Sequence, residues 1–138
     1  MENNFEKALK FVLSHEAEFV DDPNDPGKAT KYGISQKAYP DLDIANLTRE
    51  DAKIIYQRDY WDKAGCGEIA NGLDIVVFDT AVNCGVSRAL AFLATTHDWR
   101  DYLFLRLDHY ASLNIAKHYM RGWTQRVFDL WRLVRMGR

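Results

Sequence analysis

The sequence lacks any long hydrophobic run. It has no stretch of 18 uncharged apolar residues, so no segment is expected to span a membrane. Its first residues, MENNFEKALKFVLSHE, contain acids where a secretory signal peptide carries basic residues, and they include no continuous apolar segment. We therefore expect a protein that is made in the cytoplasm without a signal peptide and that makes no stable membrane insertion.

Cysteine and histidine are scarce and are poorly spaced for metal or redox chemistry. Cys66 and Cys84 match no zinc or redox motif, so we expect free thiols, with a disulfide as the alternative. The four histidines form no metal-binding motif such as H-E-x-x-H. The sequence therefore predicts no metal site, and we expect no cofactor.

Repeats, low-complexity tracts and linkers are also missing from the 138 residues, of which 47% are apolar. This length and apolar content predict one domain over residues 1–138 with a hydrophobic core. Strand patterns are few, and helical patterns are expected over residues 5–19, 35–40 and 48–61, over GLDIVVFDTAVNCG as far as Gly85, over SRALAFLATT, from Asp98 onward, and over 123–134. The predicted fold class is mainly α, with at most a small β element near residues 29–35.

The net charge of −2 hides an uneven distribution. The segment from residue 117 to 138 contains a single acid and six basic residues, which are Lys117, Arg121, Arg126, Arg132, Arg135 and Arg138. A basic end on an acidic body would favour contact with an anionic polymer. A solvated helix face explains the same charges, and both interpretations stay open.

Two glutamates stand near the end of the first predicted helix, in SHEAEFVDDPNDPGKATKYGIS. At about 100° per residue, Glu16 falls within the apolar stripe of that helix, roughly 20° from Phe5, whereas Glu18 falls on the opposite side. A carboxyl group among apolar side chains loses hydration and tends to hold its proton, as a general acid must. The alternative is that the helix ends before Glu16, which would then only border the core.

A rigid acidic loop follows the glutamates. DDPNDPGKAT contains Asp21, Asp22 and Asp25, and its two prolines restrict the backbone, so it is suited to hold a second carboxylate opposite Glu16. Two carboxyl groups in different environments are the usual equipment for cleaving a glycosidic bond. A plain acidic turn is the alternative interpretation.

The same stretch resembles a family signature. HEAEFVDDPNDPGKATKYGIS is similar to the H-E-G-G-Y-x-x-D-P-x-D-P-G-G-x-T-x-x-G-I motif of the secretion-activator lysozymes, glycoside hydrolase family 108. The resemblance continues in IYQRDYWDKAGCGEIANGLDIVVFDTAVNCGVSRALAFL and in YMRGWTQRV. It implies a lysozyme-like α fold that cuts the glycan of bacterial peptidoglycan.

Carried over position by position, the resemblance implies that Glu16 is the catalytic acid. The spacing from Glu16 to Asp25 and Thr30 resembles the Glu/Asp/Thr triplet of small phage lysozymes, although the Asp-to-Thr spacing there is one residue longer. Asp25 and Thr30 are thus expected to hold charge or water opposite Glu16, with Asp22 as the competing acid.

Further residues are expected to bind substrate. Tyr32 and Gly33, in TKYGIS, should line the cleft, and Asp79 and Asn83, one turn apart on a helix, should bond sugar or orient Glu16. The alternative for Asp79 and Asn83 is an internal cap or a hydrogen-bonded pair in the core. Two tryptophans, Trp61 and Trp123, would either stack on sugars or belong to the core.

The chain departs from the family pattern twice. Ala17 and Glu18 replace the Gly-Gly pair after the acid, and only THDW stands where an inserted wall-binding lobe is usual, which indicates a compact member. The expected activity is that of a muramidase, with a lytic transglycosylase or a non-catalytic wall-binding or secretion-accessory protein as alternatives. The expected partners are peptidoglycan strands and, for release to the cell wall, a holin. We expect a monomer that binds no nucleic acid.

Overall fold

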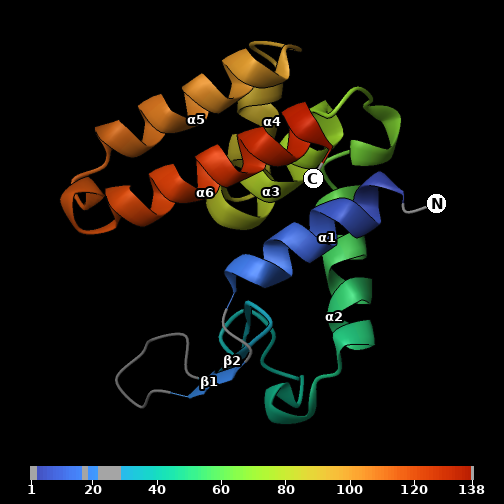
Figure 1. Cartoon of the computed structure of the whole chain (residues 1–138). Helices are drawn as coiled ribbons and strands as arrows, with labels where there is room; N and C mark the ends of the chain where they lie inside the picture. The colour runs from blue at the N-terminus through green and yellow to red at the C-terminus, as the bar shows by residue number, and fades with distance from the viewer. Residues whose placement is uncertain (1–2, 17–18, 22–28, 138) are drawn as a thin grey trace.

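Six α-helices and a small three-stranded sheet occur in the computed structural model, which describes residues 3–16, 19–21 and 29–137 (Figure 1). The α-helices are α1 (Asn4–His15), α2 (Arg49–Tyr56), α3 (Leu73–Cys84), α4 (Val86–Leu93), α5 (Trp99–Ser112) and α6 (Ala116–Met136), and the strands are β1 (Phe19–Asp21), β2 (Ala29–Lys31) and β3 (Ile34–Ser35). Three short helical segments lie between these elements: η1 (Ile44–Asn46), η2 (Gln57–Asp62) and η3 (Cys66–Glu68). The mainly α class with a small β element is confirmed, and none of the helices described is both long and apolar enough to cross a membrane.

The first helix is shorter than its sequence pattern predicts. Asn3 caps α1 by accepting a hydrogen bond from the backbone N–H of Glu6, and Phe5, Leu9 and Val12 are buried on one face, as expected. The helix ends at His15, however, and Phe19 belongs to β1. Glu16 is therefore the residue that follows the helix, with an extended backbone at φ −107° and ψ 143°.

Local capping signals in the middle of the chain are confirmed. Thr48 and Asp51 form the reciprocal capping box that opens α2. The helical path of α2 continues without a break into the π-helical segment η2, which ends at Asp62, close to the predicted end at residue 61. The helix expected from Ser35 is wrong, since Ser35 pairs with Thr30 in the sheet and only turns follow it.

Helix α3 is the centre of the core. Its residues from Leu73 to Ala81 are all buried, and it contacts α1, α4, α5 and α6. As predicted, it ends before Gly85, which adopts a φ of +95°. Because α3 is enclosed by other helices, polar side chains on it must find partners inside the protein.

Helices α5 and α6 run side by side along one flank of the molecule (Figure 1). Asp98 caps α5, as predicted, by accepting hydrogen bonds from the backbone N–H groups of Arg100 and Asp101. Only residues 94–98 join α4 to α5, so no lobe is inserted at this point. Helix α6 is longer than predicted, because it begins seven residues before Trp123.

The sheet closes tightly beside the end of α1. Strand β2 pairs antiparallel with both β1 and β3, in the order β1-β2-β3, and Lys31 lies opposite Ile34. The hairpin turn between β2 and β3 therefore consists of Tyr32 and Gly33 alone, and both have positive φ, at +52° and +79°. Two-residue hairpin turns of the type I′ class require this conformation at both positions.

Candidate active site

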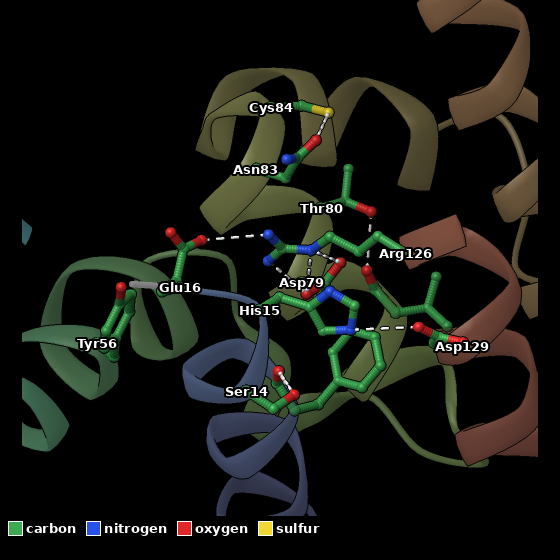
Figure 2. Close-up of polar contacts among 12 residues, drawn as sticks. Ser14, His15, Glu16, Tyr56, Asp79, Thr80, Asn83, Cys84, Arg126 and Asp129 are labelled. Atoms are coloured by element: carbon green, nitrogen blue, oxygen red, sulfur yellow. Dashed lines mark hydrogen bonds and ion pairs between the residues drawn. The ribbon is translucent and has the colours of Figure 1, made fainter. Parts of the chain in front are cut away.

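Glu16 lies where helix α1 gives way to the sheet. Its carboxyl group points between Tyr56 and Arg126 (Figure 2), and its side chain is 27% exposed. Of the two interpretations, the alternative is correct, because the helix ends at His15, before Glu16, and a buried arginine contacts the carboxyl group. The carboxyl group is nevertheless fixed in place and open to solvent on one side.

The hairpin turn approaches Glu16 so closely that it requires glycine. A Cβ atom at Gly33 would lie 2.9 Å from Cγ and 3.0 Å from Cδ of Glu16, and 2.5 Å from the hydroxyl of Tyr56. The φ of +79° at Gly33 is also unfavourable for residues with a side chain. The backbone of Gly33 therefore forms one wall of the space around the Glu16 carboxyl group.

Tyr56 anchors this turn through a hydrogen bond to its backbone. Its hydroxyl donates a hydrogen bond of 2.6 Å to the backbone carbonyl of Tyr32. Burial, and after it the charge of Glu16, raises the pKa of Tyr56 above its ordinary value. The phenol therefore stays protonated and continues to donate, which holds the hairpin turn against Glu16.

Arg126, on α6, contacts Glu16 from the other side. Its Nη1 atom lies 3.1 Å from Oε1 of Glu16, and its Nη2 atom lies 2.8 Å from Oδ1 of Asp79 (Figure 2). Its Nε atom lies 3.3 Å from both carboxylate oxygens of Asp79. Arg126 thus holds Oε1 of Glu16, and Oε2 has no hydrogen-bond partner among the residues that the structure describes.

Asp79 is the buried counter-charge behind this contact. Its side chain is 1% exposed, and its Oδ2 atom lies 2.7 Å from Nη1 of Arg106. Burial on its own would raise the pKa of Asp79, but the guanidinium groups of Arg106 and Arg126 outweigh it and hold this pKa below its ordinary value. Because Asp79 is enclosed and both its oxygens are engaged, it offers no surface to a sugar. Its expected role in orienting Glu16, through Arg126, stays a prediction beside the core alternative.

The polar network extends to Asn83 through Tyr110. Arg106 donates from Nε to the Tyr110 hydroxyl at 2.7 Å and from Nη1 to the Thr80 hydroxyl at 3.1 Å. The Tyr110 hydroxyl in turn donates to Oδ1 of Asn83. Asn83 is half-buried, and its side-chain NH₂ group has no acceptor within the described residues, so it is free to donate to a ligand.

The other predicted site residues fall in three places. Thr30 lies in β2, opposite Val20 and Ser35, and its hydroxyl has no hydrogen-bond partner among the residues described. Tyr32 forms the turn together with Gly33, and its side chain is half-buried. Asp22, Asp25 and Glu18 lie outside the described residues, so the second acid stays a prediction.

The two tryptophans proposed for sugar stacking are engaged within the protein. Trp61 is buried and packs edge-on against Phe5 and Phe78, with ring centroids 5.3 and 5.5 Å away. Trp123 stacks on Tyr110 at 4.6 Å and on Tyr119 at 5.4 Å. Trp61 therefore belongs to the core, which was one of its two expected places. The rings of Tyr110, Trp123 and Tyr119 form a continuous stack.

The basic C-terminal surface is smaller than its sequence indicates. Arg126 is buried in the site, Arg132 lies 3.0 Å from Asp129, and the guanidinium group of Arg135 lies 4.9 Å from the ring centroid of Trp131. Arg138 lies outside the described residues. Arg132 and Arg135 thus have intramolecular partners, whereas Lys117 and Arg121 are also exposed, so both interpretations of the basic end stay open.

Sequence reasoning missed the roles of Arg126 and Arg106. A signal was present, because Arg126 shares a helical face with Leu130 and Leu133, four and seven residues later, and all three are buried. A cation in line with core residues needs a buried acid as a partner, and Asp79 was the acid available. Among the described residues, no cluster of histidine, cysteine, aspartate and glutamate has the size needed to hold a metal ion.

Comparison with known proteins identifies the family. The model of the family described as glycosyl hydrolase 108 matches residues 9–85, which is more than half of the chain and includes Glu16, Gly33, Asp79 and Asn83. The chain belongs to this family. The glycosyl hydrolase 108 assignment fixes the general reaction as hydrolysis of a glycosidic bond and makes a glycan the substrate class.

A solved structure supports the assignment. The structure of Brucella abortus SagA superimposes with a TM-score of 0.79 and 27% sequence identity, over 91% of this chain and 90% of that chain. This agreement extends beyond residue 85 into α5 and α6, which contribute Arg106 and Arg126 to the site of this glycosyl hydrolase 108 member. No curated protein matches the sequence.

Proposed function

We propose that this protein is a muramidase, which hydrolyses the bond between N-acetylmuramic acid and N-acetylglucosamine in peptidoglycan, with Glu16 as the general acid. The observation that carries the proposal is the carboxyl group of Glu16, of which Arg126 contacts one oxygen. It is partly exposed in a chain that belongs to a glycoside hydrolase family, and it coincides with the acid implied by the HEAEF motif. A carboxylic acid beside the leaving oxygen is the group that such a reaction requires.

The contacts of Glu16 fit the work of a proton donor. Arg126 holds Oε1, and Gly33 lies against Cγ and Cδ, so the carboxyl group has a defined orientation. The proton resides on Oε2, because Oε1 still accepts the hydrogen bond from Arg126 when the acid is protonated. Transfer of this proton to the glycosidic oxygen accompanies cleavage of the bond from that oxygen to the sugar C1, and water then adds to C1.

The buried charges decide what Arg126, whose Nη1 atom lies 3.1 Å from Oε1 of Glu16, does for the proposed acid. Arg126 makes its shortest bond to Asp79, and Asp79 is also matched by Arg106. Two guanidinium groups therefore share the single negative charge of Asp79, so Arg126 keeps positive charge toward Glu16. Its contact with Glu16 orients the carboxyl group and pairs with the carboxylate that proton transfer leaves. Proton transfer from Glu16 leaves this arrangement intact.

The second catalytic group is proposed from the sequence. Asp25, with Asp22 as the alternative, would support the positive charge that develops at C1 or would activate the water, and Thr30 would help to hold that water. If neither aspartate contributes, Glu16 alone must serve as acid and base. The reaction is then that of a lytic transglycosylase, in which the sugar's own hydroxyl replaces water.

Product analysis on purified peptidoglycan tests the proposal. A muramidase releases muropeptides that end in a reducing N-acetylmuramic acid, which borohydride converts to muramitol. A lytic transglycosylase gives anhydro-muramic ends, which are lighter by one water and resist borohydride. Reducing N-acetylglucosamine ends, or no release of soluble fragments, would contradict the proposal.

Release to the wall through a holin also stays a proposal, and it rests on the family resemblance alone. It predicts that expression in a bacterial cytoplasm leaves cells intact until the membrane is permeabilised. Lysis that follows expression directly, without permeabilisation, would contradict it.

A further inference from the structure

An apolar hollow lies between α5 and α6, away from the candidate active site. It has a volume of about 250 Å³ and is lined by Arg100, Leu103, Phe104, Leu107, Val127, Phe128 and Trp131. Phe104 is 69% exposed and Phe128 is 48% exposed. Two such phenylalanines at the rim of one hollow form a contiguous apolar surface of the kind that marks an interaction site.

This surface is independent of the reaction chemistry. On α6, Phe128 follows Arg126 by two residues, which places the two side chains roughly 200° apart around the helix. Arg126 faces Glu16 and Asp79, so Phe128 projects to the opposite side. A partner bound in the hollow therefore leaves the Glu16 carboxyl group open to substrate.

The charges on α5 indicate what the partner is. Arg100, Phe104 and Asp108 are spaced four residues apart, so they form one ridge along α5 with Phe104 at its centre. All three side chains are exposed, and Asp108 has no ion-pair partner in the part of the chain that the structure describes. The guanidinium group of Arg100 lies over the ring of Trp99, 4.4 Å from the ring centroid. It makes no ion pair with any residue that the structure describes.

A ridge with a cation at one end, an acid at the other and a phenylalanine between them is complementary to itself. A two-fold axis beside Phe104 sets the α5 helices of two copies antiparallel, and Arg100 of each copy then faces Asp108 of the other. Each copy's Phe104 enters the hollow of its partner. Such an interface is isologous, as in most small homodimers.

We propose that the α5–α6 hollow binds a second copy of this chain, so that the protein forms a two-fold dimer through Phe104, with reciprocal ion pairs between Arg100 and Asp108. The monomer expected from sequence is thereby replaced by a reversible dimer. This proposal does not depend on the proposed catalytic function.

Sedimentation velocity from low micromolar to millimolar protein tests the dimer. The full chain should shift from monomer to dimer as concentration rises. Phe104→Asp, which places an acid beside the two-fold axis in both copies, should raise the dissociation constant by at least about 100-fold. The matched control is Ile54→Asp, on α2, which alters an exposed apolar residue at 61% exposure and should leave the dissociation constant unchanged.

Charge exchange tests the register of the two helices. Arg100→Asp and Asp108→Arg, each made alone, set like charges opposite one another and should raise the dissociation constant about tenfold. The double variant restores opposite charges and should return it to near the starting value. Because these side chains are exposed, thermal unfolding of every variant should match that of the unchanged protein at concentrations where both are monomeric.

Two outcomes would overturn the proposal. A protein that stays monomeric over the whole concentration range shows that a different molecule occupies the hollow, or none. A dimer that Phe104→Asp leaves intact, or that the double charge exchange fails to restore, is built on another surface or another register.

Discussion

Replacement of Asp79 by asparagine should destabilise the protein strongly, because it leaves Arg106 and Arg126 buried without the counter-charge that they share. The Asp79 carboxylate accepts from Arg126 at 2.8 Å and lies 2.7 Å from Arg106, and its side chain is 1% exposed. Breaking a buried ion pair by removing one partner costs about 3–5 kcal/mol. Since small domains are stable by roughly 5–15 kcal/mol, the variant should fold but lose a large share of its stability.

Urea unfolding at pH 7 measures this loss, and α3 contains a matched control. Asp74 is also a buried aspartate on α3, but among the described residues it accepts hydrogen bonds only from the Asn4 side chain and the Ile75 backbone N–H. Asp74→Asn therefore removes a charge with neutral partners and should cost about 1 kcal/mol. The difference between the two variants isolates the contribution of the arginines.

The loss should also depend on pH in a defined direction. The paired arginines hold the pKa of Asp79 below its ordinary value, so its ionised form stabilises the folded state. This contribution is fully present above the unfolded pKa of about 3.9 and disappears as pH falls through the lower folded pKa. The gap in free energy of unfolding between the unchanged protein and Asp79→Asn should therefore be constant near neutrality and shrink below about pH 4.

The same variant should lower activity, since Arg126 loses the anchor that directs it at Glu16. Three results would refute this reasoning: equal losses of stability for Asp79→Asn and Asp74→Asn, a gap that persists unchanged at pH 3, or full activity of Asp79→Asn on peptidoglycan.

Two further predictions concern the hairpin turn and the thiols. Gly33→Ala should lower the free energy of unfolding by roughly 1–3 kcal/mol and slow the clearing of a turbid wall suspension, because the new Cβ would clash with Glu16. The control is Gly65→Ala, which has a similar φ of +70° and open space around it. It should lower the free energy of unfolding less and leave clearing unchanged. Burial raises the pKa of Cys66 to about 12, so a thiol reagent at pH 8 should label Cys84 first in the folded protein, as followed by mass spectrometry. After denaturation both thiols should react without reductant. Equal labelling rates of Cys66 and Cys84 in the folded protein would contradict the order of labelling, and a need for reductant would contradict the free thiols.

Elements that depend on local chemistry could be predicted from the sequence. Thr48 with Asp51, Asp98 and Gly85 each mark a helix end through contacts within a few residues, and the structure has a helix boundary at all of them. The buried character of α3 also follows from composition, since most of its residues are apolar. These features need no knowledge of distant parts of the chain.

The end of α1 could not be predicted in this way, because a distant strand decides it. Periodicity continues the helix to Phe19, but the backbone of Phe19 pairs with Lys31 in the sheet. The helical wheel therefore placed Glu16 in the core stripe for the wrong physical reason, and its role as the acid stays a prediction from the family resemblance. Its carboxyl group is oriented by contacts with Arg126 and Gly33 rather than by an apolar stripe.

The charged network escaped prediction because its members are far apart in sequence. Arg126 lies 47 residues from Asp79 and 110 residues from Glu16. Counting charges along the chain placed Arg126 on a basic surface, whereas its helical register with Leu130 points inward. A single sequence gives the face on which a charge lies, and the partner becomes known only when the helices are assembled.

The most direct test of the account is the activity of Glu16→Gln on purified peptidoglycan, measured as soluble muropeptides released per unit time. Glutamine keeps the oxygen that accepts from Arg126 but has no proton to give to the leaving oxygen, so the rate should fall by roughly 10²–10⁴ while urea unfolding changes little. The matched control, Glu68→Gln, removes an exposed carboxyl group in η3 and should retain full activity. A folded Glu16→Gln protein that keeps more than about a tenth of the activity would contradict the assignment of Glu16 as the general acid.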